Sequence, residues 1–180
     1  MWQEKAKKIK LFITDVDGVL TDGQITLGTQ HQEWKSFHAQ DGLGIALAQK
    51  AGIAVAIITG RYSEAVERRA QELNIKFVYQ KIKDKRKALQ EIMAELDLTR
   101  AEIAYIGDDL NDLPILEQAG LRLAVANAVP EVKVRVDYVT EKEGGKGAVR
   151  EALVLILQAQ GKWEEIVASY LEKPEEGGEQ

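Results

Sequence analysis

Lys10-Leu-Phe-Ile-Thr-Asp-Val-Asp-Gly18 is a short apolar run that leads directly into two carboxylates and a glycine. The run, counted from Ile9 to Thr14, predicts a buried strand of a parallel sheet, and the glycine predicts a turn after it. Open α/β sheets bind ligands at the carboxyl ends of their strands. Asp15 and Asp17 are therefore candidate site residues, although a turn that only leaves the strand explains them equally well.

Outward from this segment, short β-branched runs alternate with amphipathic stretches. The runs predict parallel strands at 9–14, 54–59, 76–79, 103–106 and 121–125. The amphipathic stretches predict helices at 43–50, 63–73, 85–96, 112–119, 148–160 and 163–171. This alternation predicts an α/β fold with a doubly wound, Rossmann-like parallel sheet. Residues 23–37 depart from it, because two β-rich pieces flank Gly28-Thr-Gln30, and they predict a β-hairpin.

Composition limits the domain count and the classes of partner. The chain has 180 residues, of which 45% are hydrophobic, and this predicts one domain at 1–171 with a flexible acidic tail at 172–180. It contains no cysteine and no apolar run long enough to cross a bilayer, so a cytoplasmic protein is expected. The net charge of −5, with no basic stripe, argues against nucleic acid or a membrane as a partner.

Three further predicted strands are also followed by a polar residue: Thr59, Lys85 and Asp108. A helix cap, a solvated helix start and a turn explain these residues one at a time. Together with Asp15, however, these residues follow four successive predicted strands, and this indicates that they share one edge of the sheet. The set suits phosphoryl transfer, because Asp15 and Asp108 can hold Mg²⁺. The lysine and the threonine can donate hydrogen bonds to the transferred group.

Four segments resemble, in order, the motifs of the haloacid dehalogenase superfamily, and the match extends from Ile9 to about Gly147. They are Asp15-Val-Asp-Gly-Val-Leu-Thr-Asp-Gly23, Thr59-Gly60-Arg61, Lys85 and Gly107-Asp-Asp-Leu-Asn-Asp112. The resemblance implies that Asp15 attacks phosphorus and forms an aspartyl phosphate. It also implies that Asp17 is the general acid for the leaving group and then the general base for water.

The resemblance further implies a set of ligands for metal and phosphate. The Mg²⁺ cofactor is expected on the carboxylates of Asp15 and Asp108 and on the backbone carbonyl of Asp17. The residues implied to bind the phosphoryl group are Thr59, Gly60 and Lys85. Asp109 and Asp112 are expected to support the metal ligands without binding the ion.

Superfamily members differ mainly in their cap domains, and here the predicted hairpin at 23–37 leaves no room for one. The site of a single subunit is therefore expected to lie open to water. The layout resembles the small capless branch that includes 3-deoxy-manno-octulosonate 8-phosphate phosphatases, which implies a homotetramer whose neighbouring subunits cover the site. The substrate contacts implied by this branch are His38, Asp41, Gly42, Arg61 and Arg69.

The sequence and the resemblance together predict a Mg²⁺-dependent phosphatase that hydrolyses a sugar-acid phosphate, such as the octulosonate 8-phosphate of lipopolysaccharide biosynthesis. Ala46 stands where the branch has an arginine. A nine-carbon ulosonate 9-phosphate, of the KDN or sialate type, and a broad range of sugar phosphates are therefore alternative substrates. Lys50 lies on the same predicted helix face, and we hypothesise that it compensates for the missing arginine.

Two other classes of function are more distant alternatives. Receiver domains of phosphorelay signalling also place carboxylates, a threonine and a lysine around Mg²⁺. They carry the phosphorylated aspartate between the acidic pair and the threonine, and no such residue occurs between Asp41 and Thr59. An inactive oligomerisation module is disfavoured because all the motif positions are intact.

Overall fold

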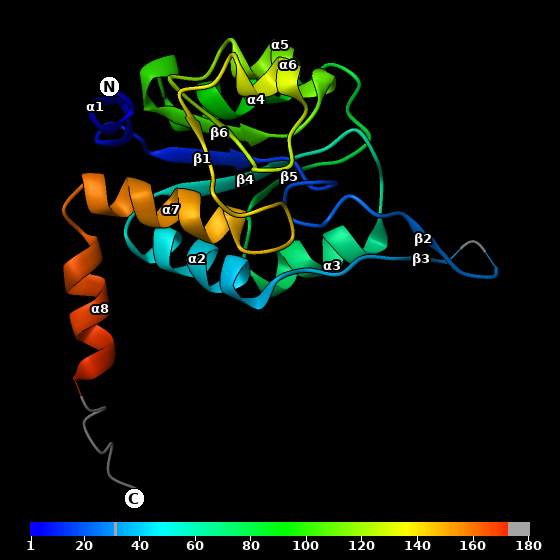
Figure 1. The fold of residues 1–180 in the computed structure, drawn as a ribbon, viewed down its shortest axis with the longest axis horizontal. Coiled ribbons are helices and arrows are strands. Elements are labelled where there is room, and N and C mark those ends of the chain that lie inside the picture. Colours follow the sequence, from blue (N-terminus) through cyan, green and yellow to red (C-terminus); the bar gives the residue numbers. More distant parts are fainter. Residues whose placement is uncertain (31, 173–180) are drawn as a thin grey trace, which may run out of the picture.

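The computed structural model describes residues 1–30 and 32–172, and its centre is a six-stranded sheet with the strand order β5-β4-β1-β6-β7-β8 (Figure 1). Every pair of neighbouring strands is parallel. The strands are β1 (Leu11–Thr14), β4 (Ala54–Ile58), β5 (Phe77–Tyr79), β6 (Ile103–Gly107), β7 (Leu121–Ala124) and β8 (Tyr138–Val139). This is the order of a doubly wound sheet, and the chain reverses direction across the sheet between β1 and β6.

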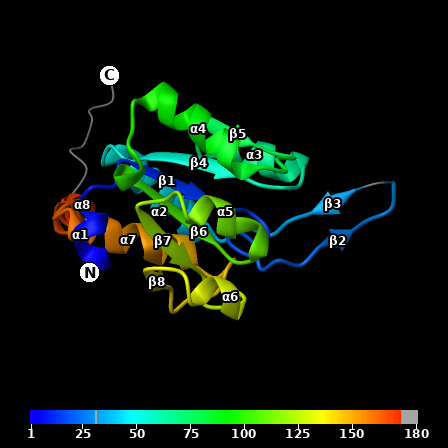
Figure 2. The same ribbon diagram turned by 90° about the horizontal axis from the view of Figure 1, so that it is seen from above.

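Helices cover both faces of the sheet (Figures 1 and 2). One face carries α2 (Ala39–Lys50), α3 (Glu64–Glu72) and α7 (Ala148–Ala159). The other face carries α4 (Lys85–Leu96), α5 (Leu113–Leu116) and α6 (Pro130–Lys133). At the ends of the described chain lie α1 (Trp2–Ala6) and α8 (Trp163–Leu171), and α8 extends away from the body of the molecule (Figure 1). No described helix is both long enough and apolar enough to cross a bilayer.

The core is centred on β1, because this strand has a neighbour on each side and helices on both faces. All four of its residues are buried, and Leu11, Phe12 and Ile13 are 0% exposed. Thr14 is opposite Ile57 of β4 and Ile106 of β6. This register brings the residues that follow the three strands to the same edge of the sheet.

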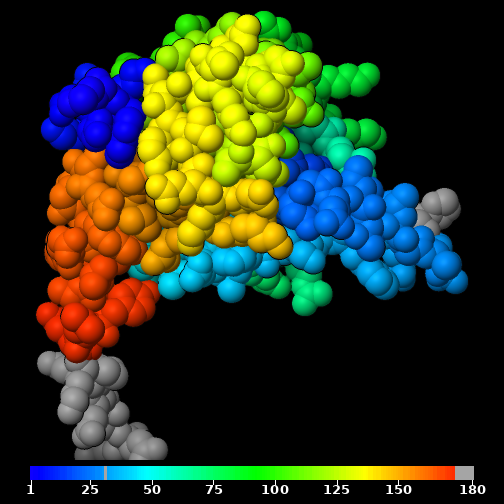
Figure 3. All heavy atoms as spheres, in the orientation of Figure 1, coloured from blue at the N-terminus to red at the C-terminus, as the bar shows by residue number. Residues whose placement is uncertain are grey.

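The predicted hairpin is present, with strands shorter than expected. Thr26–Leu27 forms β2 and Glu33–Trp34 forms β3, and the two pair antiparallel with Thr26 opposite Trp34. The ribbon views and the space-filling view all show the hairpin projecting from the body of the molecule (Figures 1, 2 and 3). Among the described residues between β1 and α2, the hairpin strands are the only helices or strands.

The fold class is confirmed, and several element boundaries are corrected. The helix expected from residue 43 begins at Ala39. Glycines disfavour helix, and here a Cβ on Gly42 would lie 2.3 Å from a side-chain nitrogen of Arg69, so a larger residue would have to displace that side chain. The helix expected at 112–119 is instead a 3-10 turn at Leu110–Asp112 followed by the four-residue α5, with a proline in its first turn. The elements α1, α6 and β8 were not expected, and the predicted tail lies, from residue 173 on, outside the described residues.

Candidate active site

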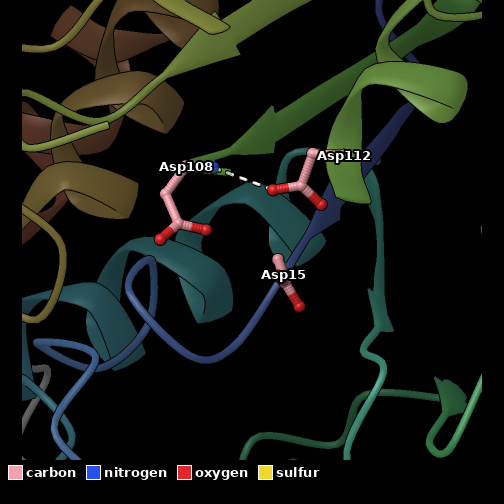
Figure 4. A group of neighbouring side chains, drawn as sticks. All are labelled: Asp15, Asp108 and Asp112. Atoms are coloured by element: carbon pink, nitrogen blue, oxygen red, sulfur yellow. Dashed lines mark hydrogen bonds between the residues drawn. The ribbon is translucent and has the colours of Figure 1, made fainter. Parts of the chain in front are cut away.

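Three carboxylates meet where the strand order reverses (Figure 4). Asp15 follows β1, Asp108 follows β6, and Asp112 ends the 3-10 turn after β6. One oxygen atom from each lies within 4.8 Å of the others. The cause is the sheet register, since β1 and β6 are hydrogen-bonded neighbours that end at the same edge.

Gly18 makes room for Asp108 beside the loop that carries Asp15. Its φ is +87°, and a Cβ at this position would lie 2.0 Å from an Asp108 carboxylate oxygen. Only glycine combines this backbone conformation with so close a contact. The loop is also held from outside, because the N–H of Gly145 donates to the carbonyl of Val19 at 3.0 Å. The glycines near residue 145 therefore help to fix the loop of Asp15.

Asp112 is fully buried, and both of its carboxylate oxygens accept hydrogen bonds. Oδ1 accepts from Lys85 Nζ at 2.6 Å and from the hydroxyl of Tyr105 at 2.5 Å. Oδ2 accepts from the backbone N–H of Asp108 at 2.8 Å and from that of Asp109 at 3.4 Å. Asp112 thus fixes the turn that presents Asp108. Tyr105, which the sequence marks only as a strand residue, is part of this network.

Lys85 is the buried cation of the site. It begins α4, directly after the N-cap residue Asp84. Its Nζ lies 3.1 Å from Asp15 Oδ2 and 2.6 Å from Asp112 Oδ1. Burial favours the uncharged amine, but the charges of Asp15 and Asp112 outweigh it and raise the pKa of Lys85. The lysine is therefore charged at neutral pH.

The cluster holds more negative charge than Lys85 offsets. Burial, together with the charge of Asp112, raises the pKa of Asp15 to about 6. Burial and the charges of Asp112 and Asp15 raise the pKa of Asp108 to about 8. Asp15 Oδ1 is buried and has no hydrogen-bond partner among the described residues. A bound cation would supply that partner and stabilise both carboxylates, so the residues present fit a hard divalent metal ion.

Asp17 lies on the hairpin side of this cluster. Its Oδ1 forms an ion pair with Lys35, and its Oδ2 is 3.6 Å from Arg61 Nε. Glu33 bridges the same two cations, at 3.0 Å from Lys35 Nζ and 2.5 Å from Arg61 Nη2. Sequence reasoning missed Glu33 and Lys35. The sequence could have indicated them, because these two charged residues flank Trp34 in a predicted strand, and alternate residues of a strand point to the same side.

Thr59 and Gly60 lie directly after β4, at the same edge of the sheet. Thr59 is buried, its N–H donates to the carbonyl of Tyr79 at 2.9 Å, and its carbonyl accepts from the N–H of Ile82 at 3.1 Å. Gly60 is exposed. The structure therefore brings the predicted phosphate-binding residues Thr59, Gly60 and Lys85 to the same edge as Asp15. Asp109 is exposed and caps the 3-10 turn, where its Oδ1 accepts from the N–H of Leu110 at 2.7 Å.

The remaining predicted substrate contacts gather around α2. His38, Asp41, Gly42 and Arg69 line one small, mostly apolar cavity. Asp41 is buried, and its Oδ1 accepts from the backbone N–H of Arg150 at 2.7 Å, so it caps the first turn of α7. Arg69 pairs with Glu72 at 3.2 Å. Asp41 thus connects α2 to α7, whereas the pair of Arg69 and Glu72 lies within α3.

The site is less open than expected from the absence of a cap. Asp15 and Lys85 are each 4% exposed, whereas Asp17 and Asp108 are half-buried. The hairpin base covers part of the rim, since Glu33 and Lys35 contact Asp17 and Arg61. Asp17 and Asp108 are therefore the more accessible carboxylates of the site.

Known proteins share the sequence pattern of this chain over most of its length. Residues 76–153 match the family model of the haloacid dehalogenase-like hydrolases. The 3-deoxy-D-manno-octulosonate 8-phosphate phosphatase of Escherichia coli K12 is 47% identical over 161 residues, which are 89% of this chain and 86% of that protein. This chain belongs to the haloacid dehalogenase-like hydrolases. The similarity covers most of both chains, so it confirms the phosphatase family as well as the fold.

Solved structures of this family match the whole fold. The phosphatase of the same name from Moraxella catarrhalis, solved with a magnesium ion, a phosphate ion and a KDO molecule, is 45% identical, with a TM-score of 0.91 and coverage of 94% of this chain and 97% of that one. A cobalt-bound phosphatase from Haemophilus influenzae is 44% identical, with a TM-score of 0.89 and coverage of 93% of this chain and 99% of that one. The sheet and the helices of this chain are thus those of the family.

The hypothesis that Lys50 compensates for the missing arginine at position 46 is wrong. The helix α2 follows the carboxyl end of β1 and leads to the start of β4, so its first turn lies at the edge of the sheet that holds the site. Lys50, in the last turn of α2, lies in a groove beside Ile166 and Tyr170 of α8. Four residues advance a helix by about 6 Å, here away from the site.

Proposed function

We propose that this chain is a Mg²⁺-dependent phosphomonoester hydrolase that acts on 3-deoxy-D-manno-octulosonate 8-phosphate through a phosphorylated Asp15. The observation that carries the proposal is the position of Asp15. It is buried at the reversal point of the sheet, where one oxygen has no hydrogen-bond partner in the described part of the chain and the other lies 3.1 Å from Lys85. A carboxylate held in this way is a defined nucleophile with an adjacent cation.

The proposed metal ligands are the carboxylates of Asp15 and Asp108 and the backbone carbonyl of Asp17. Asp112 is a poor candidate ligand because both of its oxygens already accept hydrogen bonds. When bound, Mg²⁺ neutralises part of the negative charge on the phosphoryl group and on the two carboxylates. Mg²⁺ usually keeps several of its waters when a protein binds it, which would suit a site with only two free carboxylates.

The first half of the proposed reaction transfers the phosphoryl group to the protein. An oxygen of Asp15 forms a bond to phosphorus while the bond from phosphorus to the sugar oxygen breaks. The protonated carboxyl of Asp17 gives its proton to the departing oxygen, which leaves as an alcohol. Lys85, Thr59 and the backbone N–H of Gly60 donate hydrogen bonds to the non-bridging phosphoryl oxygens.

The second half regenerates the carboxylate. Water attacks the phosphorus of phospho-Asp15 and gives a proton to the carboxylate of Asp17, and the bond between phosphorus and the Asp15 oxygen breaks. Inorganic phosphate leaves, and Asp17 is again protonated for the next cycle. Lys85 stays in place because it also donates a hydrogen bond to Asp112.

The substrate class rests on the relatives and on two arginines. Arg61 lies beside Asp17, and Arg69 lies in the cavity with His38 and Asp41. A guanidinium binds a carboxylate through two parallel hydrogen bonds, which suits a sugar acid. Ala46 supports a second candidate, a nine-carbon ulosonate 9-phosphate, because it offers no cation on α2 at this position.

Two further properties belong to the proposal. We expect a cytoplasmic protein, in keeping with the absence of cysteine. We also expect a homotetramer in which neighbouring subunits cover the site. Support for the tetramer comes from the projecting hairpin, where Ile25, Leu27 and Trp34 are 49%, 72% and 62% exposed. Light scattering after gel filtration tests it, and a monomer at micromolar concentration would contradict it.

The decisive test is a phosphate-release screen with Mg²⁺ across octulosonate 8-phosphate, nonulosonate 9-phosphates, hexose phosphates and phosphoglycolate. A preference of at least about a hundredfold in kcat/KM for the octulosonate is expected. A preference for a nine-carbon substrate would select the second candidate. Asp15→Asn is expected to lower turnover by more than about a thousandfold while the protein stays folded. Near-normal turnover would refute the role of Asp15 as nucleophile.

A further inference from the structure

Glu33 and Lys35 form a charged pair at the base of the hairpin, in which the lysine side chain is buried and the glutamate partly buried. Alternate residues of a strand point to the same side, and the exposure follows that rule. The side chain of Lys35 is 1% exposed and that of Glu33 is 18% exposed, whereas Trp34 between them is 62% exposed. A lysine is rarely so well buried on a projecting hairpin unless its charge is paired.

The contacts of Lys35 all lead to the acidic side of the site. Its Nζ pairs with Oδ1 of Asp17 and lies 3.0 Å from Oε1 of Glu33. Glu33 in turn pairs with Arg61 at 2.5 Å. Two anions and two cations thus close a ring, and the hairpin supplies one of each. In this ring Lys35 is the only described residue with a hydrogen bond to the Asp17 carboxylate, because the Arg61 Nε lies 3.6 Å away.

We propose that Lys35 is a positioning residue that fixes the orientation of the Asp17 carboxylate, and the inference rests on the proposed function. Lys35 engages Oδ1, so Oδ2 is the oxygen left to give the proton to the leaving group and to take it from water. Glu33 holds the lysine against Asp17 from the other side. The hairpin thereby contributes to proton transfer within its own subunit.

A merely structural role for Lys35 would affect all substrates alike, whereas a role through Asp17 depends on the leaving group. Phenoxide is a poor leaving group and needs the proton of Asp17. p-Nitrophenoxide, of nearly the same size, leaves far more readily without one. The ratio of the two rates within one variant is independent of how much of that variant is folded.

The experiment measures single-turnover release of phenol and of p-nitrophenol, with enzyme in excess and Mg²⁺ present. For Lys35→Met we expect the rate with phenyl phosphate to fall by about tenfold to a hundredfold and that with p-nitrophenyl phosphate by less than about threefold. Lys35→Arg should recover part of the loss. Asp17→Asn gives the limit for a missing acid. Lys76→Met is the matched control. Lys76 also pairs with a glutamate, Glu95, but it directly precedes β5 and so lies at the amino ends of the strands, away from the site.

An equal loss with both substrates, or no loss with either, would overturn the role of Lys35. So would a p-nitrophenyl to phenyl ratio in Lys35→Met that matches the ratio of the unsubstituted protein. Failure of the proposed function has a different signature, since the unsubstituted protein would then hydrolyse neither aryl phosphate nor the sugar-acid phosphates with Mg²⁺. The two failures are therefore distinguishable.

Discussion

Lys85 Nζ lies 2.6 Å from Asp112 Oδ1, and the two side chains are 3% and 0% exposed. This buried ion pair connects the start of α4 to the turn after β6. It aims Lys85 at Asp15 while Asp112 also holds the backbone of Asp108. One carboxylate therefore organises both the cation and the proposed metal ligand of the site.

Removing that carboxylate should destabilise the protein as well as the site. Asp112→Ala leaves Lys85, Tyr105 and the backbone N–H of Asp108 without their acceptor, so we expect a loss of about 3 kcal/mol in the free energy of unfolding. Urea denaturation measures it. Asp109→Ala is the matched control, because Asp109 is exposed and only caps the same turn, with an expected cost of about 1 kcal/mol or less. Equal losses in the two variants would contradict the proposed role of Asp112.

The raised pKa values make the metal-free protein less stable at higher pH. The pKa of Asp108 is about 8 in the folded state against an ordinary value of 3.8, so the folded protein binds this proton more tightly than the unfolded chain. The stability contribution is present at low pH and is lost as the pH rises through this window. Asp15, with a pKa of about 6, acts in the same direction.

Thermal melts with EDTA at pH 5 and pH 8 test this expectation. Asp108→Asn should raise the Tm at pH 8 by roughly 2–4 °C for each kcal/mol of repulsion removed, and it should abolish hydrolysis. Millimolar Mg²⁺ should raise the Tm of the unsubstituted protein at pH 8 and have little effect on Asp108→Asn. A variant that is less stable than the unsubstituted protein in EDTA at pH 8 would be inconsistent with repulsion at Asp108.

Glu33 forms an ion pair with the guanidinium of Arg61, which we expect to bind the carboxylate of the substrate. Glu33→Gln keeps the shape of the side chain but weakens this competition, so the KM for a sugar-acid phosphate should fall by about threefold to tenfold. The KM for a hexose phosphate, which has no carboxylate, should stay within about twofold. Steady-state kinetics with both substrates decide the matter. A parallel change in both KM values would show that Arg61 does not bind the carboxylate.

Asp41 is expected to act through stability, because its Oδ1 caps α7 from a different helix. Asp41→Ala should lower the free energy of unfolding by about 1–2 kcal/mol. Asp41→Asn keeps the accepting oxygen, and burial already raises the pKa of Asp41, so this variant should be close to neutral. Chemical denaturation and kcat/KM are measured on both. A large loss of kcat/KM in the stable Asn variant would instead indicate a direct substrate contact.

The parallel sheet could be predicted from sequence because its strands are nearly continuous apolar runs. Their boundaries in the structure differ from the expected ones by two residues or fewer. The start of α2 could not be predicted, because Gly42 lies near its beginning, glycine disfavours helix, and the N-cap residue His38 makes no capping hydrogen bond through its side chain. A two-residue strand such as β8 carries no period from which to recognise it.

The sequence by itself determined the order of Asp15, Thr59, Lys85 and Asp108 after successive strands, and hence the edge at which they meet. Local pattern suffices for this, because every strand of a parallel sheet ends at the same edge. Only the tertiary structure decided which groups contact Asp17, that Asp112 engages both Lys85 and the turn of Asp108, and that Asp41 caps α7. Apart from the contact between Asp112 and Asp108, which are four positions apart, those contacts join residues at least 18 and as many as 109 positions apart, and no local period encodes the distance between them.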